Sequence, residues 1–447
     1  MQFTISVKHL WTCLSYYKIN LEGMLVMKKN KHMLTWVITL LLFTLTSLNP
    51  AYANNIKAND QDTKKVKEVI NEYFQAQLDS VKSKNISLIE KSNSIIDVTT
   101  ESGKEIYDYE FGKAKYLITS YKLDNTTLEN YNYEINYTAI EFNNNEAVVD
   151  LSITKNMKYN FLKDNFSTNE SHKITLKKDY PKWLINNDEY DTDFKSLYPI
   201  GTDFNVLIND LPEFYNNYIK AVNDSKTKYN SNEDITNQII SPMSIPGDHD
   251  DYYYYSNRQN AVSYALSYTE ETNDFTWDTY NNAQFKHYYD QYGEPADCQN
   301  FVSQCIWRGF GSSTSSSATK DYPMNSQWWA NLSGETSTWN WTSAGTFKNY
   351  IISNENSNSY GIHGGEFIIP NDTQIGDYIY VPGHVLFVTR ATDSNGNGII
   401  DYSEIYISAH TANRRDYNLK ANYLGIIPQG TRFMKIYSYK WNDGLGY

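Results

Sequence analysis

The stretch 297-DCQNFVSQC-305 predicts a buried helix that begins with a cysteine. Asp297 is an N-cap candidate, and the apolar positions behind it recur at helical spacing, at Phe301, Val302, Cys305 and Ile306. We therefore place Cys298 in the first turn, where free backbone N–H groups and the positive end of the helix dipole favour a thiolate. Cys305 falls about two turns later on the apolar face, where a thiol packs as a small hydrophobic group.

The same helix argues against a disulfide between Cys298 and Cys305. Their spacing along a helix corresponds to a rise of about 10 Å, which exceeds the Cα separation that a disulfide tolerates. The third cysteine, Cys13, precedes a segment with the features of a secretory signal. We expect two free thiols in the mature chain.

Residues 27–53 have the three parts of a secretory signal peptide. These parts are a basic start at Lys28, Lys29 and Lys31, an apolar run over 34–48, and the small-x-small cleavage site 51-AYA-53. Residues 1–26 then reflect a start codon assigned too early. The alternative is an uncleaved anchor, but the apolar run is shorter than a usual membrane span. We expect a secreted or cell-wall-associated protein of a Gram-positive-type bacterium.

Composition and charge limit the classes of function. A chain of 447 residues with 40% hydrophobic residues has room for two or three folded domains. Its formal net charge of −13 excludes a nucleic-acid partner, because binding to a phosphate backbone relies on clustered Lys and Arg.

Residues 55–220 predict a first α+β domain. A helical repeat of apolar residues over 64–81 is followed by alternating strands over 131–139 and 147–153, with further strands at 172–176 and 182–186. This order resembles the cystatin or nuclear-transport-factor type of α+β domain, and no catalytic cluster is evident in it. We interpret 221–251 as a linker and 252–447 as a second domain.

A nucleophilic cysteine needs a base, and the second domain offers one in a predicted hairpin. The segment 376-GDYIYVPGHVLFVTR-390 reads as two strands around a turn, with His384 at the start of the second. The next strand, 404-EIYISAHT-411, would return beside His384 and bring His410 or Thr411 within reach. Two other histidines compete for the role, His287 and His363, but neither begins a strand pattern.

The order of these motifs resembles the papain-like fold of NlpC-type and CHAP-type cell-wall hydrolases, and more closely the bacterial putative amidase domain family. The resemblance runs from about Tyr255 to Asp416. It includes 258-RQNAVSYALSY-268, 327-QWWANLSGETSTWNWTSAGTF-347 and 408-SAHTANR-414. The fold class that it implies is α+β, with a papain-like catalytic domain preceded by the separate first domain.

By this resemblance Cys298 is the nucleophile, His384 the base and His410 the third polar member, with Asn413 as the alternative. Gln299 departs from the Thr or Ser that related sequences often carry at its position. The implied enzyme is a cysteine amidase or peptidase without an organic cofactor. For an exported protein, the natural substrates are amide bonds of peptidoglycan. The competing hypothesis is a non-catalytic wall-binding protein on the same fold.

The segment 393-DSNGNGIIDYSE-404 matches a twelve-position calcium loop. The positions that supply ligands are Asp393, Asn395, Asn397, Ile399 through its carbonyl, Asp401 and Glu404. The competing interpretation is a plain hairpin turn rich in Asn and Gly. A bound Ca²⁺ would be structural and would clamp the hairpin at the end opposite His384.

Overall fold

The computed structural model describes residues 60–231, 252–255, 257–269, 285, 288, 296–312, 324–330, 336–357, 359–411 and 413–440. The predicted signal peptide, Cys13 and His287 lie outside these residues. The first part of the chain contains α4 (Asp60–Ser83), α5 (Ser87–Glu90), η2 (Lys91–Ser94), α6 (Glu101–Leu123), β1 (Leu128–Asn143), β2 (Glu146–Tyr159), β3 (Phe166–Asp179), β4 (Lys182–Tyr190), α7 (Asp193–Leu197) and α8 (Phe204–Ser231). No described helix is long and apolar enough to cross a membrane.

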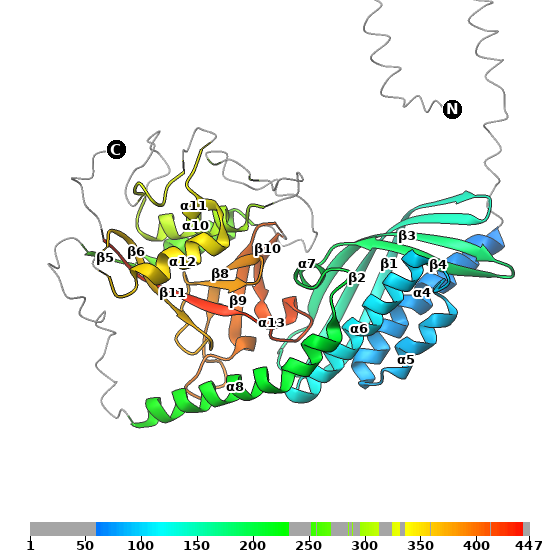
Figure 1. Ribbon diagram of the computed structural model, residues 1–447, viewed down its shortest axis with the longest axis horizontal. Helices are drawn as coiled ribbons and strands as arrows, with labels where there is room; N and C mark the ends of the chain where they lie inside the picture. The colour runs from blue at the N-terminus through cyan, green and yellow to red at the C-terminus, as the bar shows by residue number, and fades with distance from the viewer. Residues whose placement is uncertain are drawn as a thin grey trace, which may run out of the picture. The chain divides into compact units, whose positions relative to one another are not determined.

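The first part is an antiparallel meander in the order β1-β2-β3-β4, with α4 and α6 on one face (Figure 1). Alternate residues of β2 are buried, as the period of a half-covered strand requires. The predicted helix and strands lie within α4, β1, β2, β3 and β4. Asn144 takes a left-handed conformation with φ 55° in the turn between β1 and β2, a conformation that asparagine tolerates.

Two features of this part differ from the sequence-based expectation. The long helix α6 was not expected, although the Thr100 side chain caps its start by accepting a hydrogen bond from the Gly103 N–H. The helix α8 continues to Ser231, so it occupies the beginning of the predicted linker over 221–251. The remainder of that linker, 232–251, lies outside the described residues.

The second part carries one larger sheet in the order β10-β9-β8-β7-β11-β5, with β6 pairing with β11. Its strands are β5 (Tyr252–Tyr254), β6 (Gly361–Phe367), β7 (Tyr378–Val381), β8 (His384–Ala391), β9 (Ile405–Ala409), β10 (Arg414–Asn418) and β11 (Arg432–Lys440). Its helices are α9 (Arg258–Ser267), α10 (Cys298–Gly309), α11 (Trp339–Thr342), α12 (Ala344–Asn354), η5 (Tyr402–Glu404) and α13 (Leu419–Asn422). Two antiparallel sheets combined with helices are compatible with the expected α+β class.

The two faces of β8 pack into different hydrophobic cores. Val385 and Phe387 lie in the core around α10, whereas Leu386 and Val388 lie in a second core. That second core also contains Tyr121, Leu211 and other residues of α6 and α8. The first part of the chain therefore shares a hydrophobic core with the second part, and its expected independence as a separate domain is not confirmed.

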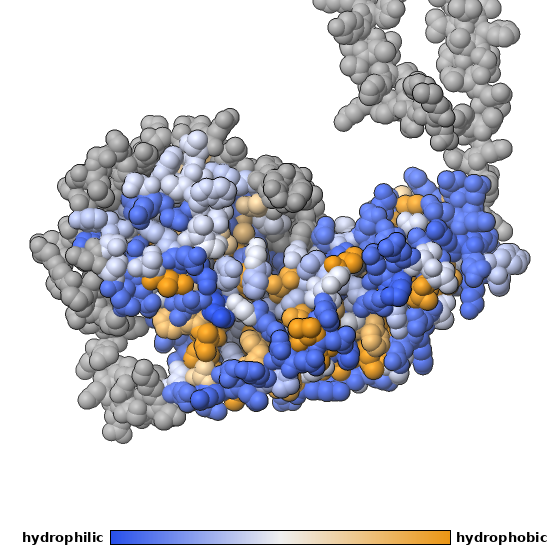
Figure 2. Space-filling view, viewed as in Figure 1, coloured by the Kyte–Doolittle hydropathy of each residue, from blue (hydrophilic) through white to orange (hydrophobic). Residues whose placement is uncertain are grey.

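Few large apolar side chains remain exposed. Figure 2 shows a mainly hydrophilic face over the described residues, with small separate apolar patches. Val206 and Ile219 of α8 are among the exposed apolar residues. Single exposed apolar residues of this kind are normal on a protein surface and indicate no binding site by themselves.

Candidate active site around Cys298 and His384

Cys298 is the first residue of α10, as the sequence predicts, and both described cysteines are free thiols. Burial raises the pKa of Cys298 to about 11, although the backbone N–H groups of Val385 and Gln299 face its sulfur and oppose this shift. The thiol is therefore protonated at neutral pH in this conformation. The N–H groups around the sulfur are also suitably placed to support negative charge that develops beside it.

Asp297 occupies the N-cap position but its side chain makes no capping hydrogen bond to the helix. Its Oδ1 accepts hydrogen bonds from the Tyr288 backbone N–H at 3.1 Å and from Asn300 Nδ2 at 2.8 Å. Its Oδ2 lies 2.9 Å from Nδ1 of His410. The expected cap is thus replaced by a network that ties the start of α10 to the chain beyond β9.

His410 is fully buried, and both of its ring nitrogens have partners. Nδ1 faces the Asp297 carboxylate and Nε2 lies 2.7 Å from the backbone carbonyl of Tyr268. The Asp297 carboxylate and the Tyr268 carbonyl thus engage both ring nitrogens. The ring also stacks on Phe301 of α10, with centroids 4.0 Å apart. Neither nitrogen is left to orient His384.

His384 begins β8 directly after the turn at Pro382 and Gly383, and β7 pairs with β8 as the predicted hairpin requires. Its Nε2 is buried and has no hydrogen-bond partner among the described residues. Burial lowers the pKa of His384 to about 4, the charge of Asp193 opposes that shift, and the charge of Arg414 adds to it. The imidazole is therefore neutral at physiological pH and retains the capacity to accept a proton.

The structure brings the backbone of His384 close to Cys298, since the N–H of the next residue, Val385, faces the sulfur. The two side chains do not hydrogen bond to each other among the described contacts. Strand alternation accounts for this, because Val385 faces α10 and its neighbour His384 then points to the other side of the sheet. His384 lines a pocket of about 90 Å³ there, together with Asp193, Leu197 and Thr411.

The other candidates for a catalytic role lie elsewhere. His363 is inside β6, where its Nε2 lies 2.7 Å from the backbone carbonyl of Ser359. Asn413 is buried, and its carbonyl accepts a hydrogen bond from Arg414 at 2.9 Å. Neither residue lines the pocket that contains His384.

The predicted calcium loop connects β8 to β9 at the end of the hairpin away from His384. Asn395 and Asn397 both donate side-chain hydrogen bonds to Oδ2 of Asp401, and Asp393 accepts from the Gly398 N–H at 2.8 Å. Both oxygens of Glu404 accept backbone N–H bonds from within the loop. These hard oxygen donors suit Ca²⁺, and Gly398 has the positive φ of 80° that the sharp turn needs.

No group of three or more His, Cys, Asp or Glu side chains is arranged as a metal site in the part of the chain that the structure describes. To bind Ca²⁺, the carboxylates of the calcium loop would therefore have to release the backbone N–H groups that they now accept hydrogen bonds from. The donor chemistry fits Ca²⁺, and calcium binding stays a prediction.

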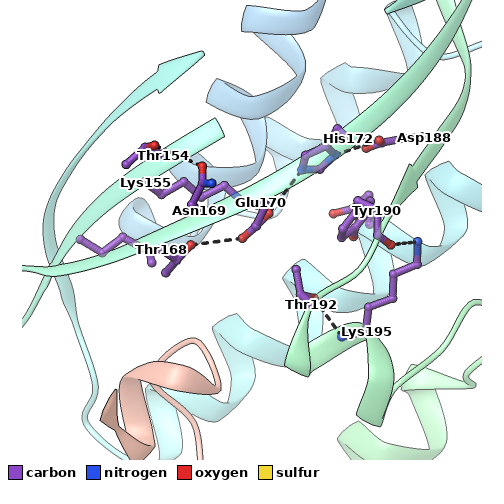
Figure 3. Close-up of polar contacts among 12 residues, drawn as sticks. Thr154, Lys155, Thr168, Asn169, Glu170, His172, Asp188, Tyr190, Thr192 and Lys195 are labelled. Atoms are coloured by element: carbon purple, nitrogen blue, oxygen red, sulfur yellow. Dashed lines mark hydrogen bonds and ion pairs between the residues drawn. The ribbon is translucent and has the colours of Figure 1, made fainter. Parts of the chain in front are cut away.

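The first part of the chain contains a buried polar chain that the sequence analysis missed (Figure 3). Lys155 Nζ lies 2.5 Å from Glu170, and the ring of His172 lies between Glu170 and Asp188, at 3.4 Å and 2.8 Å. Burial alone would lower the pKa of His172, but the two carboxylates outweigh it and raise the pKa. One signal was available, since Lys155 stands at an inward position of β2 between Ile153 and Met157.

A family model matches part of the chain. No curated protein and no solved structure matches the chain. The matched segment begins just after β5 and ends within β11, so it contains Cys298, His384, His410 and the calcium loop. Residues 255–436 match the family model described as a putative amidase domain, which confirms the resemblance to the putative amidase domain family drawn from the sequence and suggests amide hydrolysis.

Proposed function

We propose that this protein is a cysteine amidohydrolase in which Cys298 forms a thioester with the acyl part of an amide. The observation that carries the proposal is the placement of Cys298 at the start of α10, inside the amidase segment, with the N–H groups of Val385 and Gln299 facing its sulfur. In a tetrahedral intermediate, donors at this position would stabilise the oxyanion.

The proposed reaction begins with transfer of the Cys298 proton to His384. The sulfur then attacks the amide carbon, so that a C–S bond forms while the carbonyl electrons move to oxygen. Collapse of the intermediate breaks the C–N bond, and the imidazolium of His384 protonates the leaving amine. Water, activated by the neutral imidazole, hydrolyses the thioester and restores the thiol. No organic cofactor takes part in these steps.

The described conformation requires a rearrangement before this chemistry. The pKa of Cys298 is about 11 and that of His384 about 4, so proton transfer between them is unfavourable in this conformation. Rotation of His384 at the start of β8, next to Gly383 with φ 81°, would bring the imidazole toward the sulfur. Contact with a thiolate would raise the pKa of the imidazole and lower that of the thiol.

We further propose peptidoglycan amide bonds as the substrate and the cell wall or the secreted fraction as the location. The support is the signal-like segment 27–53, because an exported amidase of a Gram-positive-type bacterium meets peptidoglycan as its most abundant amide polymer. We also propose that 393–404 binds a structural Ca²⁺, on the strength of its oxygen donors.

A non-catalytic wall-binding protein is the second candidate. It is favoured by the unpaired Nε2 of His384 and by the exposed Trp339, whose side chain is 78% exposed and could contact a sugar. Under this hypothesis the cysteine and the histidine are retained for packing alone.

Digestion of purified peptidoglycan, resolved by mass spectrometry, tests the proposal. The wild-type protein should release new amine and carboxyl ends, Cys298→Ser should release none, and Cys305→Ala should retain turnover. Iodoacetamide should label Cys298 and abolish turnover. Equal slow labelling of both thiols, with no cleaved product, would support the binding protein instead.

A further inference from the structure

Thr411 has an unusual backbone conformation beside the proposed active site. Its φ is 78°, in the left-handed region that β-branched residues rarely adopt. Such conformations persist only where surrounding contacts hold them, and they concentrate at functional sites. Contacts between Thr411 and its surroundings must therefore compensate for the strain of this conformation.

The first contact joins Thr411 to the start of the nucleophile's helix. Its Oγ1 accepts a hydrogen bond from the backbone N–H of Asp297 at 3.1 Å. Asp297 directly precedes Cys298, so the hydroxyl of Thr411 is fixed relative to the nucleophile by one short stretch of backbone.

Thr411 also lies beside His384, because the two residues line the same pocket. In the β8–β9 ladder the last pair on this side is Phe387 with Ser408, and Thr411 follows shortly after the end of β9. Both residues line the pocket of about 90 Å³. The buried Nε2 of His384 has no partner among the described residues, so the pocket contains a polar atom that requires one.

The alternatives for this partner are weaker. His410 has both ring nitrogens engaged, by Asp297 and by the Tyr268 carbonyl. The carboxylate of Asp193 is held by Arg414, whose Nε lies 3.1 Å away. Ser196 also lines the pocket, but it belongs to α7, and no hydrogen bond among the described residues links its side chain to the nucleophile's helix.

We propose that Thr411 is the positioning residue for His384, in the place that the resemblance assigned to His410. In the rotated conformation that the cysteine mechanism requires, one lone pair of its Oγ1 keeps the Asp297 N–H and the other accepts the Nε2–H of His384. Nδ1 is then the ring nitrogen that exchanges a proton with Cys298. This inference rests on the proposed cysteine mechanism, and it adds the residue that fixes the tautomer and the orientation of the base.

The charged and titratable groups around His384 matter for its test. They are Asp193 of α7, Arg414 of β10, Tyr423 after α13 and Cys298 of α10. Substitution of Thr411 leaves all of these charges in place. A changed pH profile in a Thr411 variant would therefore report the lost hydroxyl and not an altered charge.

The variants are Thr411→Val, which keeps the shape and removes the hydroxyl, and Thr411→Ser, which keeps the hydroxyl. Thr411→Val should lower kcat by about 10- to 100-fold with KM within about twofold, since an oriented base contributes rate and not ground-state binding. Thr411→Ser should restore most of kcat. Thr119→Val, the same change at a threonine of α6 whose hydroxyl donates to the Lys115 carbonyl of its own helix, should leave kcat and KM unchanged.

Two further measurements distinguish a positioning role of Thr411 from a role in folding, and test it without relying on the proposed reaction. Thr411→Gly relieves the left-handed strain, so it should raise or preserve Tm while kcat falls. The pH dependence of Cys298 alkylation needs no substrate, and in Thr411→Val it should match that of His384→Ala. Unchanged kcat and an unchanged alkylation profile in Thr411→Val would overturn the proposal. Turnover retained by Cys298→Ser would instead overturn the cysteine mechanism.

Discussion

Removal of the Arg414 charge should destabilise the whole protein, because Arg414 and Asp193 form a buried ion pair between the two parts of the chain. Their side chains are only 7% and 5% exposed, and Arg414 also donates a hydrogen bond to Asn422 at 2.9 Å. A buried pair that loses one partner leaves a charge without compensation. The expected loss for Arg414→Met is about 3–5 kcal/mol of unfolding free energy.

The double variant tests the reason for this loss. Asp193→Asn together with Arg414→Met removes both charges, so it should cost less than the sum of the two single changes. The coupling energy should reach about 1–3 kcal/mol, in the upper range for residues in direct contact. Urea unfolding followed by circular dichroism measures each free energy.

A second Arg–Asp pair, between β8 and β10, provides a matched control. Arg390 and Asp416 also form an Arg–Asp pair, but their side chains are 51% and 38% exposed. Arg390→Met should therefore cost less than about 1 kcal/mol. An equal loss for Arg414→Met and Arg390→Met would refute the argument that burial of the Asp193–Arg414 pair joins the two parts.

Three further predictions concern other sites. Folding raises the pKa of His172, so the stability that its protonated ring contributes is complete below about pH 6.5 and is lost as the pH rises through the folded-state pKa. His172→Gln should therefore lower Tm more at about pH 5.5, where the ring is protonated, than at about pH 9, where it is neutral. Cys305→Ala should cost about 1–3 kcal/mol, measured by urea unfolding, because Cys305 is fully buried. Calcium at about millimolar concentration should raise Tm relative to EGTA, and Glu404→Gln should abolish that difference; equal melting in calcium and EGTA would contradict the calcium loop.

The elements that the sequence predicted well depend on local signals. The helix behind Cys298 follows from apolar residues at helical spacing, and the β7–β8 hairpin follows from alternation around Pro382 and Gly383. The pairing of β8 with β9 was also expected, since the strands flank a short polar loop. Each of these depends on residues near one another in the chain, so periodicity and turn chemistry were sufficient.

The parts that were missed depend on contacts between distant segments. His410 and Thr411 are neighbours just beyond the end of β9, yet His410 contacts Asp297 and Tyr268 whereas Thr411 lines the pocket that contains His384. Asp297, the actual partner of His410, precedes it by 113 positions, and no local pattern signals that pair. The network of buried polar side chains around His172 likewise joins β3 to β4. Each of these side chains points inward from its strand, so the network depends on which strands pair.

The pocket around His384 includes residues of α7, which lies outside the segment that matches the amidase family. The amidase family match covers 255–436, yet Asp193, Ser196 and Leu197 of α7 line the pocket that contains His384. Residues of α6 and α8 also share the core beneath β8. The first part of the chain therefore supplies one wall of the pocket around the proposed base. A movement that brought His384 to Cys298 would take its side chain out of this pocket, so contacts with α7 can influence the rate at which the proposed base becomes available.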